Sequence, residues 1–430
     1  MKTRHQIIDK KYLSFAIFWF IVIGYLQTVP SLTAQQIDTS EYIQFSGLVK
    51  NSKTKNPLEF ANIVINKTNI STVSNSEGEF LLKVPKSDLD KSITITYLGY
   101  YNKEISIGDL TTKKNVILLD EFIEKLSEVS LIAKDPQFLI DKVIENIKKN
   151  YFEEPVIMTA FYRESIKKRK KYASLSEAVV EIYKQPYKSM SYDYIKLNQA
   201  RKSSDYRRLD TLLIKLQGGP YNALNFDIIK NNKIIFNEDV FNNYRFTFDK
   251  SITINNRPTY VLSFKQYSNI PYPLFYGKLY IDANSYALSK AVISLNLESK
   301  ESASRYFVKK KPYNAKVEPK VANYQVDFLE KNGKWYYGYS RIELAFKIDW
   351  DKKLFNSMYY ITIEMAVTDW KPNTENISLK NKEKLKSNII LNDRASGFSD
   401  PEFWGDYNVI EPEKSIENAI KKIQRQLERN

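Results

Sequence analysis

Apolar and polar positions alternate over short stretches of residues 42–119, and this pattern predicts a compact all-β domain. The expected strands lie within residues 43–48, 60–65, 80–84, 93–97 and 116–118. Turn-forming residues separate them at 51–57, 66–69, 75–78 and 85–90. Short strands with regular turns are typical of a β-sandwich, so we predict a first domain over residues 35–119.

Residues 120–150 are predicted to connect this domain to the rest of the chain and to end in a helix. Asp135 followed by Pro136 is a typical helix start, with a capping carboxylate and a proline in the first turn. Apolar residues then recur at helical spacing from Leu139 to Ile147, and Asn150 is a suitable end.

Residues 151–430 have the pattern of an antiparallel β domain. Asn332-Gly333 and the segment 282–285 each separate two alternating stretches, which predicts two β-hairpins. A basic stretch at 172–216 has a more helical pattern, and apolar residues recur on one helical face over 416–427. The predicted fold class is mainly β, with a small sandwich and a larger antiparallel sheet or half-barrel that has flanking helices.

The first 34 residues have the pattern of a secretory signal peptide. Basic residues precede the apolar run 12–26, and residues 30–34 are a suitable cleavage region. Leu32 is larger than the small residue preferred three places before a cut, so an uncleaved anchor is the alternative. No cysteine follows the run, which argues against a lipoprotein, and no second run predicts a transmembrane span. We expect an exported protein that is periplasmic or associated with the outer membrane.

Histidine and cysteine are nearly missing from the chain, which limits its chemistry. The one histidine, His5, lies in the predicted signal peptide, and there is no cysteine. Ser-His-Asp and Cys-His catalysis, His-ligated zinc and Cys-ligated clusters are therefore excluded in the mature chain. We predict that the protein is not an enzyme and has no catalytic, cofactor-binding or metal-binding residues.

The net charge is +15, and about +12 remains without residues 1–34. Export argues against nucleic acid as a partner, so the partners that we expect are an envelope protein or an anionic lipid or glycan. Genome composition is the explanation that we favour for much of this charge, because Lys, Asn, Ile, Tyr and Phe are all encoded by A/T-rich codons.

Three basic stretches, 167–171, 201–208 and 309–311, have aromatic residues close to them in the sequence. The aromatic residues are Tyr162, Tyr172, Tyr206, Tyr306, Phe307 and Tyr313. Basic charge beside rings is one way to bind an anionic lipid or glycan. The pattern also fits sheet residues with charges outward and rings inward, which is the interpretation that we favour.

Two segments match the Ser-x-x-Lys spacing of penicillin-recognising enzymes, Ser165 to Lys168 and Ser52 to Lys55. No Ser-Asp-Asn or Lys-Thr-Gly motif accompanies them, so a structural role is favoured for both. Gly218-Gly219-Pro220 lacks the Gly-Lys-Ser/Thr ending of a phosphate loop and predicts a turn.

Two clusters of oxygen-bearing side chains are candidate calcium ligands. Asn75, Glu77 and Glu79 alternate along a predicted turn, and Asp400, Glu402 and Asp406 surround Trp404. Neither set has the spacing of a known calcium loop. The first set is expected to form a turn. The second is expected to accompany docking of the C-terminal segment, with the rings of Phe403 and Trp404 as buried anchors.

Five separated elements of the first domain resemble the carboxypeptidase regulatory-like domain, a transthyretin-like sandwich. They are residues 47–49, 57–58, 61–63, 72–80 and 96–100. Ser74-Asn75 stands where the family usually has Thr-Asp, and Gly78 supplies the positive φ of the turn. Tyr97, Gly99 and Tyr100 are expected to be structural determinants of the sandwich rather than a site. The resemblance implies an envelope protein of Bacteroidetes and an accessory role without peptidase activity.

The successive strand-turn-strand units of the larger domain weakly resemble the half-barrel of periplasmic lipoprotein carriers. We predict a non-catalytic exported protein that binds a partner or supports surface assembly. One alternative is a lipid or lipoprotein carrier, which requires an apolar cavity of several hundred Å³ on the concave face, as an order of magnitude. The other is a hydrolase with two carboxylates roughly 5–10 Å apart in an open cleft.

Overall fold

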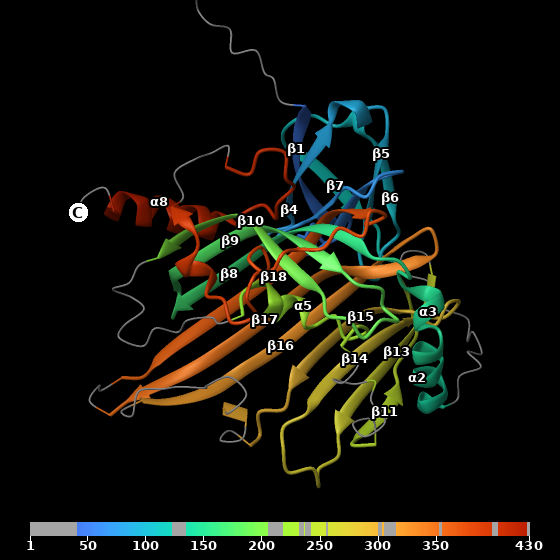
Figure 1. Ribbon diagram of the computed structural model, residues 1–430, viewed down its shortest axis with the longest axis vertical. Helices are drawn as coiled ribbons and strands as arrows, with labels where there is room; N and C mark the ends of the chain where they lie inside the picture. Colours follow the sequence, from blue (N-terminus) through green and yellow to red (C-terminus); the bar gives the residue numbers. More distant parts are fainter. Residues whose placement is uncertain are drawn as a thin grey trace, which may run out of the picture. The chain divides into compact units, whose positions relative to one another are not determined.

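The computed structural model describes residues 41–122, 135–204, 218–231, 236, 242–254, 257–299, 303–304, 315–351, 355–397 and 403–427. The predicted signal peptide lies outside these residues. Residues 42–430 belong to one compact unit. Strands dominate this unit, which confirms the predicted fold class (Figure 1). Within the described ranges, no helix has both the length and the apolar content needed to cross a bilayer.

The N-terminal part is a sandwich of two small sheets. Its strands are β1 (Tyr42–Asn51), β2 (Asn62–Ile65), β3 (Ser71–Val73), β4 (Glu79–Pro85), β5 (Ser92–Thr96), β6 (Lys103–Ser106) and β7 (Asn115–Leu119), with short 3-10 turns η1 (Lys86–Asp88) and η2 (Ile107–Asp109). One sheet has the order β4-β1-β7 and the other β3-β2-β5-β6. The alternating apolar residues of both sheets form a shared core that includes Phe45, Ile63 and Phe80.

The turn before β4 forms as its residues predict. Gly78 has a φ of 75°, and a Cβ at this position would lie 2.7 Å from the Val49 carbonyl oxygen. The Asn75 side-chain oxygen accepts hydrogen bonds from the backbone N–H groups of Glu77 and Glu79. Tyr97 and Tyr100 pack edge to face at 5.1 Å against the sandwich core, which agrees with a structural role.

The predicted connecting helix is present as α2 (Pro136–Glu145), followed by the short α3 (Ile147–Asn150). The Asp135 carboxylate accepts a hydrogen bond from the Gln137 N–H, so the predicted cap is confirmed. Leu139, Ile140 and Val143 are fully buried in the core of the larger sheet.

The larger sheet has twelve strands. They are β8 (Val156–Lys168), β9 (Lys171–Lys184), β10 (Tyr194–Ser204), β11 (Tyr244–Phe248), β12 (Ile252–Ile254), β13 (Arg257–Gln266), β14 (Phe275–Asp282), β15 (Leu288–Leu295), β16 (Ala315–Lys331), β17 (Lys334–Trp350), β18 (Ser357–Pro372) and β19 (Ser396–Gly397). The order is β11-β13-β14-β15-β16-β17-β18-β8-β9-β10-β19, and β12 pairs with β13. All pairs are antiparallel except β10–β19. The remaining short elements are α5 (Pro220–Leu224), η4 (Leu391–Asp393) and α8 (Lys414–Leu427).

Both predicted hairpins are present. Asn332 and Gly333 have φ angles of 53° and 78° and join β16 to β17. Asp282 accepts hydrogen bonds from the N–H groups of Asn284 and Ser285 between β14 and β15.

The helical prediction for 172–216 is wrong within the described residues, since β9 and β10 occupy much of this stretch. Its Ala, Glu and Leu residues favour a helix locally, but long pairings with β8 on one side of β9 and β10 on the other override that preference.

One face of the sheet, here called the inner face, packs on α2 and α5 and forms the main core. Ile361, Ile363 and Met365 of β18 lie on this face and are almost completely buried. Figure 1 shows α5 beside β17 and β18, where its Ala223 carbonyl accepts hydrogen bonds from Tyr337 and Ser340. The predicted turn at 218–219 leads into this helix, with both glycines at positive φ.

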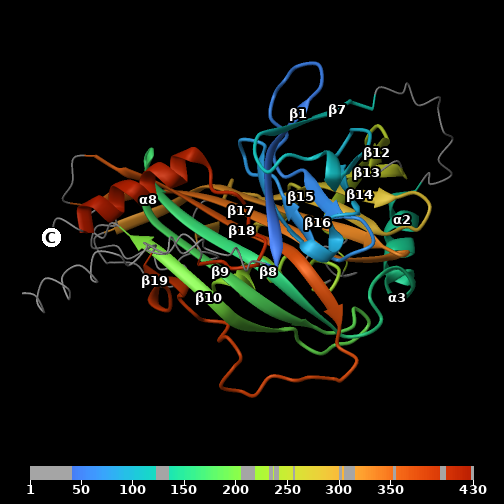
Figure 2. The ribbon, with the colours of Figure 1, turned by 90° about the horizontal axis from the view of Figure 1, so that it is seen from above.

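The opposite face, here called the outer face, contacts the sandwich and residues 403–413, here called the C-terminal segment. Strand β3 lies against β18, and both views show the blue sandwich close to the strands of the sheet (Figures 1 and 2). The Ser71 hydroxyl donates to the Val367 carbonyl oxygen at 3.1 Å. Trp404 is buried and packs edge to face on Phe161 at 5.5 Å, and Phe403 is partly buried beside it. The predicted docking of this segment is therefore confirmed.

Candidate functional site

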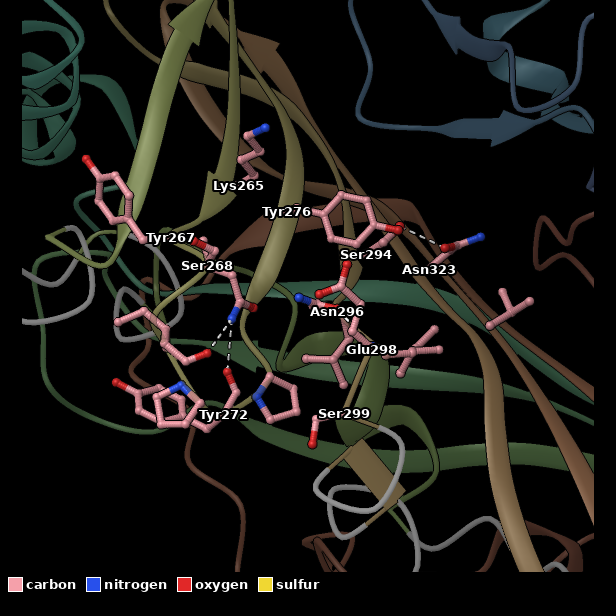
Figure 3. Close-up of a pocket in the computed structure, with 18 of the residues that line it drawn as sticks. Lys265, Tyr267, Ser268, Tyr272, Tyr276, Ser294, Asn296, Glu298, Ser299 and Asn323 are labelled. Carbon is pink, nitrogen blue, oxygen red and sulfur yellow. Dashed lines mark hydrogen bonds between the residues drawn. The ribbon is translucent and has the colours of Figure 1, made fainter.

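An open groove of about 870 Å³ lies where β13, β14, β15 and β16 meet the loops at one end of the sheet (Figure 3). Its described lining comprises Arg245, Lys265, Gln266, Tyr267, Ser268, Ile270, Pro271, Tyr272, Pro273, Tyr276, Ser294, Leu295, Asn296, Leu297, Glu298, Ser299, Lys320, Val321, Ala322 and Asn323. This volume is in the upper part of the range for small-molecule sites. We name it the tyrosine groove.

The loop 267–273 forms one wall of the groove and is held by the side chain of Gln266. The Gln266 amide nitrogen donates to the carbonyl oxygens of Ile270 and Tyr272, and its amide oxygen accepts from the Leu274 N–H at 2.8 Å. Pro271 and Pro273 restrict the backbone between these contacts. The wall is therefore ordered by the protein itself before any ligand binds.

Gly277 lets β14 approach β15 closely beside the groove. A Cβ there would lie 2.1 Å from the Val292 carbonyl oxygen, and its φ is 150°. On the next strand pair, the Ser294 hydroxyl donates to the Asn323 side-chain oxygen at 2.8 Å (Figure 3). These contacts join the three successive strands β14, β15 and β16 into one surface.

Three tyrosines in the lining keep large parts of their rings in solvent. The exposed fractions are 39% for Tyr267 and 46% for both Tyr272 and Tyr276. A tyrosine ring offers an apolar face, and its hydroxyl is a donor and an acceptor, so exposed tyrosines suit a ligand that is partly apolar and partly polar.

The charges in the groove are mainly positive. Arg245 lies over the Tyr267 ring at 5.7 Å, and Lys265 is exposed on the adjacent strand. Lys320 pairs with Glu318 at 2.8 Å. Glu298 is the one carboxylate among the described lining residues. A two-carboxylate mechanism thus has no pair in this part of the described surface, whereas binding of an anion is favoured.

The sequence did not indicate the groove, and the basic stretches that it did indicate lie elsewhere. Residues 167–171 close the β8–β9 hairpin, and Arg201 lies on β10 beside the C-terminal segment. Residues 205–208, 306–307, 309–311 and Tyr313 lie outside the described residues. The available signal for the groove was the run Tyr267-Ser-Asn-Ile-Pro-Tyr272-Pro, which is too long and too aromatic for a simple hairpin turn.

The Ser-x-x-Lys segments are structural. Ser165 and Lys168 lie three residues apart on β8, so their side chains leave opposite faces of the strand. Ser165 is buried, and Lys168 lies over the Tyr359 ring at 5.8 Å. The second segment follows Asn51, whose side-chain oxygen accepts from the Lys53 and Thr54 N–H groups in a turn.

The carboxylate clusters contact the chain itself. Asn75 donates to the Glu411 carbonyl oxygen at 3.2 Å, and Glu79 pairs with Lys414 at 3.3 Å. Asp400 and Glu402 lie outside the described residues. Elsewhere along the described chain, no group of three or more acidic or histidine side chains is placed to hold a metal ion.

One buried acid lies on the inner face, away from the groove. Glu164 is 5% exposed and accepts a hydrogen bond from the Tyr162 hydroxyl at 2.8 Å. Burial raises the pKa of the Glu164 carboxyl to about 7, and the hydrogen bond from Tyr162 limits the rise. This residue is a candidate for pH-dependent stability.

We expect Glu164→Gln to stabilise the protein near pH 8 and to have little effect near about pH 5. A carboxyl whose pKa rises from 4.5 to about 7 on folding weakens the fold as pH rises between these values, because the unfolded chain ionises first. Urea unfolding at both pH values measures the difference. An equal effect of the substitution at the two values would contradict the raised pKa.

Comparison with known proteins identifies the first domain. Residues 45–131 match the family model described as the CarboxypepD_reg-like domain. No curated protein is similar enough in sequence to match this chain.

Three solved structures are similar to parts of the chain. A putative outer membrane lipoprotein-sorting protein domain from Vibrio parahaemolyticus is 11% identical, with 58% of this chain and 96% of that chain covered and a TM-score of 0.25. A DUF1329 family protein from Desulfovibrio piger is 11% identical, with 57% and 96% covered and a TM-score of 0.25. Lipovitellin, in a structure described by its lipid–protein interactions, is 10% identical, with 56% and 28% covered and a TM-score of 0.27.

The family match spans the same elements that the sequence resemblance rests on, from Gly47 to Tyr100. Residues 45–131 of this chain therefore carry a carboxypeptidase regulatory-like domain, joined to a large antiparallel sheet.

Proposed function

We propose that this protein is a non-catalytic binding protein of the cell envelope, and that the tyrosine groove binds an acidic oligosaccharide. The observation that carries the proposal is the combination of an open groove of about 870 Å³ with three half-exposed tyrosines. The C–H faces of sugar rings stack on such aromatic rings, and their hydroxyls hydrogen bond to the hydroxyls and amides of the lining.

Charge favours an acidic sugar over a neutral one. Arg245 and Lys265 lie on the same side of the groove as Tyr267, while Glu298 is the single acid of the described lining. A carboxylate on the ligand would be attracted to these cations in a partly screened site. The mixed polar character of the lining is less suited to an acyl chain.

We expect Tyr272→Ala and Tyr276→Ala each to weaken binding of an oligogalacturonide by roughly fivefold, because each removes a stacking ring that contributes about 1 kcal/mol. Isothermal titration calorimetry with the oligogalacturonide and with a neutral malto-oligosaccharide measures both affinity and charge preference. The acidic sugar should bind more tightly, and its advantage should shrink at high salt.

The matched control is Tyr192→Ala, since Tyr192 is 82% exposed and is not part of the groove lining. It should bind the sugar like the wild type. The proposal fails if neither sugar binds, or if the control loses as much affinity as the groove variants.

A lipid carrier is the second candidate, and the apolar inner face is the observation that favours it. Ile361, Ile363 and Met365 of that face are covered in this structure, and α5 packs on β17 and β18. A carrier would have to move the segment around α5 to admit an acyl chain. Native mass spectrometry of the chain purified gently from its own envelope would show a bound lipid mass; a bare chain would speak against this function.

A further inference from the structure

The β8–β9 hairpin ends in five consecutive basic residues. Residues 167–171 read Lys-Lys-Arg-Lys-Lys, and the last pairing before the turn joins Lys168 to Lys171. Arg169, Lys170 and Lys171 are exposed. Among the described residues, no carboxylate forms an ion pair with these three side chains. Their charge is therefore directed to solvent at the end of a long hairpin.

Exposed rings lie beside this charge. Strand β18 runs next to β8, with Tyr360 opposite Lys167, and the Arg169 N–H donates to the Met358 carbonyl oxygen at 2.8 Å. The connection between β17 and β18 thus lies at the same end of the sheet. Its Phe355 is 77% exposed, and Tyr360 is 43% exposed.

Helix α8 adds further positive charge on the same side. Its Ile416 packs on Tyr172 and Leu175, immediately after the basic run, which places the helix along β9. Lys421 and Arg425 lie one turn apart on its exposed surface. Ile416 and Ile420 are used in this contact, while Lys421 and Arg425 are exposed.

We propose that this end of the sheet, here called the basic tip, docks the protein on an anionic lipid bilayer. The basic residues would contact the headgroups, and Phe355 would enter the interface between headgroups and acyl chains. An exposed phenylalanine beside the charge favours a bilayer over a soluble polyanion, because only the bilayer can bury the ring. No residue of the tip lines the tyrosine groove, so this inference does not depend on the proposed ligand.

The test is co-sedimentation of the chain from residue 35 onwards, which retains the whole compact unit 42–430. The vesicles are pure phosphatidylcholine or an equimolar mixture with phosphatidylglycerol. Binding is expected to the anionic vesicles only and should weaken at high salt. The triple variant Arg169→Gln/Lys170→Gln/Lys171→Gln should bind about a hundredfold more weakly, at about fivefold per basic residue near the surface. Phe355→Ser should weaken binding by about tenfold.

A matched triple variant, Lys53→Gln/Lys86→Gln/Lys113→Gln, removes the same charge from exposed positions of the sandwich. It should keep most of the binding, which separates a local docking surface from a general effect of net charge. Equal losses in the two triple variants would overturn the proposal. A second result would also overturn the proposal: the tip variant still binds the vesicles but no longer binds soluble heparin. The tip would then be a binding site for a polysaccharide.

Discussion

Replacing Glu177 by glutamine should lower the free energy of unfolding by about 4 kcal/mol, because it leaves two guanidinium groups without their shared counter-charge. Arg163 Nε lies 2.7 Å from one carboxylate oxygen of Glu177, and Arg201 Nε lies 2.9 Å from the other. The exposed fractions of the Arg163 and Glu177 side chains are 3% and 1%. Urea unfolding of the two proteins at neutral pH measures the loss.

The same network holds the C-terminal segment, so the loss should extend to it. Arg163 also donates to the Ile410 carbonyl oxygen at 2.7 Å, and Arg201 lies over the Trp404 ring at 4.7 Å. Because the sheet holds three further tryptophans, the Trp404 signal is obtained by subtracting the fluorescence of a Trp404→Phe protein; it should change earlier in the urea titration of the variant than the circular dichroism of the sheet.

Acid pH should reduce the difference between the two proteins. Burial alone would raise the pKa of Glu177, but the guanidinium groups of Arg163 and Arg201 hold it below its usual 4.5. The stability that this carboxylate contributes is present above the unfolded pKa and is lost as pH falls through the folded one.

Glu181→Gln is the control on the same strand. Its ion pair with Lys196 is at 3.2 Å, and the two side chains are 27% and 38% exposed, so the substitution should cost less than about 1 kcal/mol. If Glu177→Gln costs no more than this control, the buried network is not a determinant of stability.

Replacing Lys184 by methionine is the second substitution with a large expected effect, again about 4 kcal/mol. The Lys184 ammonium lies 2.6 Å from Asp193 and 2.7 Å from Asp227, and its side chain is completely buried. Without it, two buried carboxylates lose the ammonium that lies between them. Asp227 follows α5, so the variant should also expose residues 218–231 to proteases, which limited proteolysis would detect.

A second variant tests whether the instability of Lys184→Met comes from the two unpaired carboxylates or from poorer packing of the new side chain. The triple variant Lys184→Met/Asp193→Asn/Asp227→Asn removes all three charges and should recover most of the stability. Lys196→Met, at a site that is 38% exposed, should have a small effect. The interpretation is wrong if the triple variant is as unstable as Lys184→Met alone.

Features that depend on contacts between near neighbours could be predicted from the sequence alone. Asp135 and Pro136 start a helix, Asn332 and Gly333 close a hairpin, and Gly78 forms the turn before β4, because each needs only contacts within a few residues. The apolar rings of Phe403 and Trp404 predicted an anchored C-terminal segment, whereas the Phe161 ring on which Trp404 packs is known only from the structure. The shortage of histidine and cysteine limits the chemistry of the chain whatever its fold, because it is a matter of composition alone.

Features that depend on strand register could not be predicted in this way, because register is set by pairing between distant segments. Residues 172–184 favour a helix locally, yet they form β9 because strands on both sides supply their hydrogen bonds. The same register brings Glu177 between Arg163 and Arg201, a pairing that no local spacing predicts.

The tyrosine groove depends on register in the same way. Its walls come from residues 245 to 323, which meet only because the five strands β11, β13, β14, β15 and β16 pair in order at one end of the sheet. Turn chemistry acts over a few residues, whereas pairing and charge balance act between segments brought together by folding, and the groove and the buried ion pairs belong to the second kind.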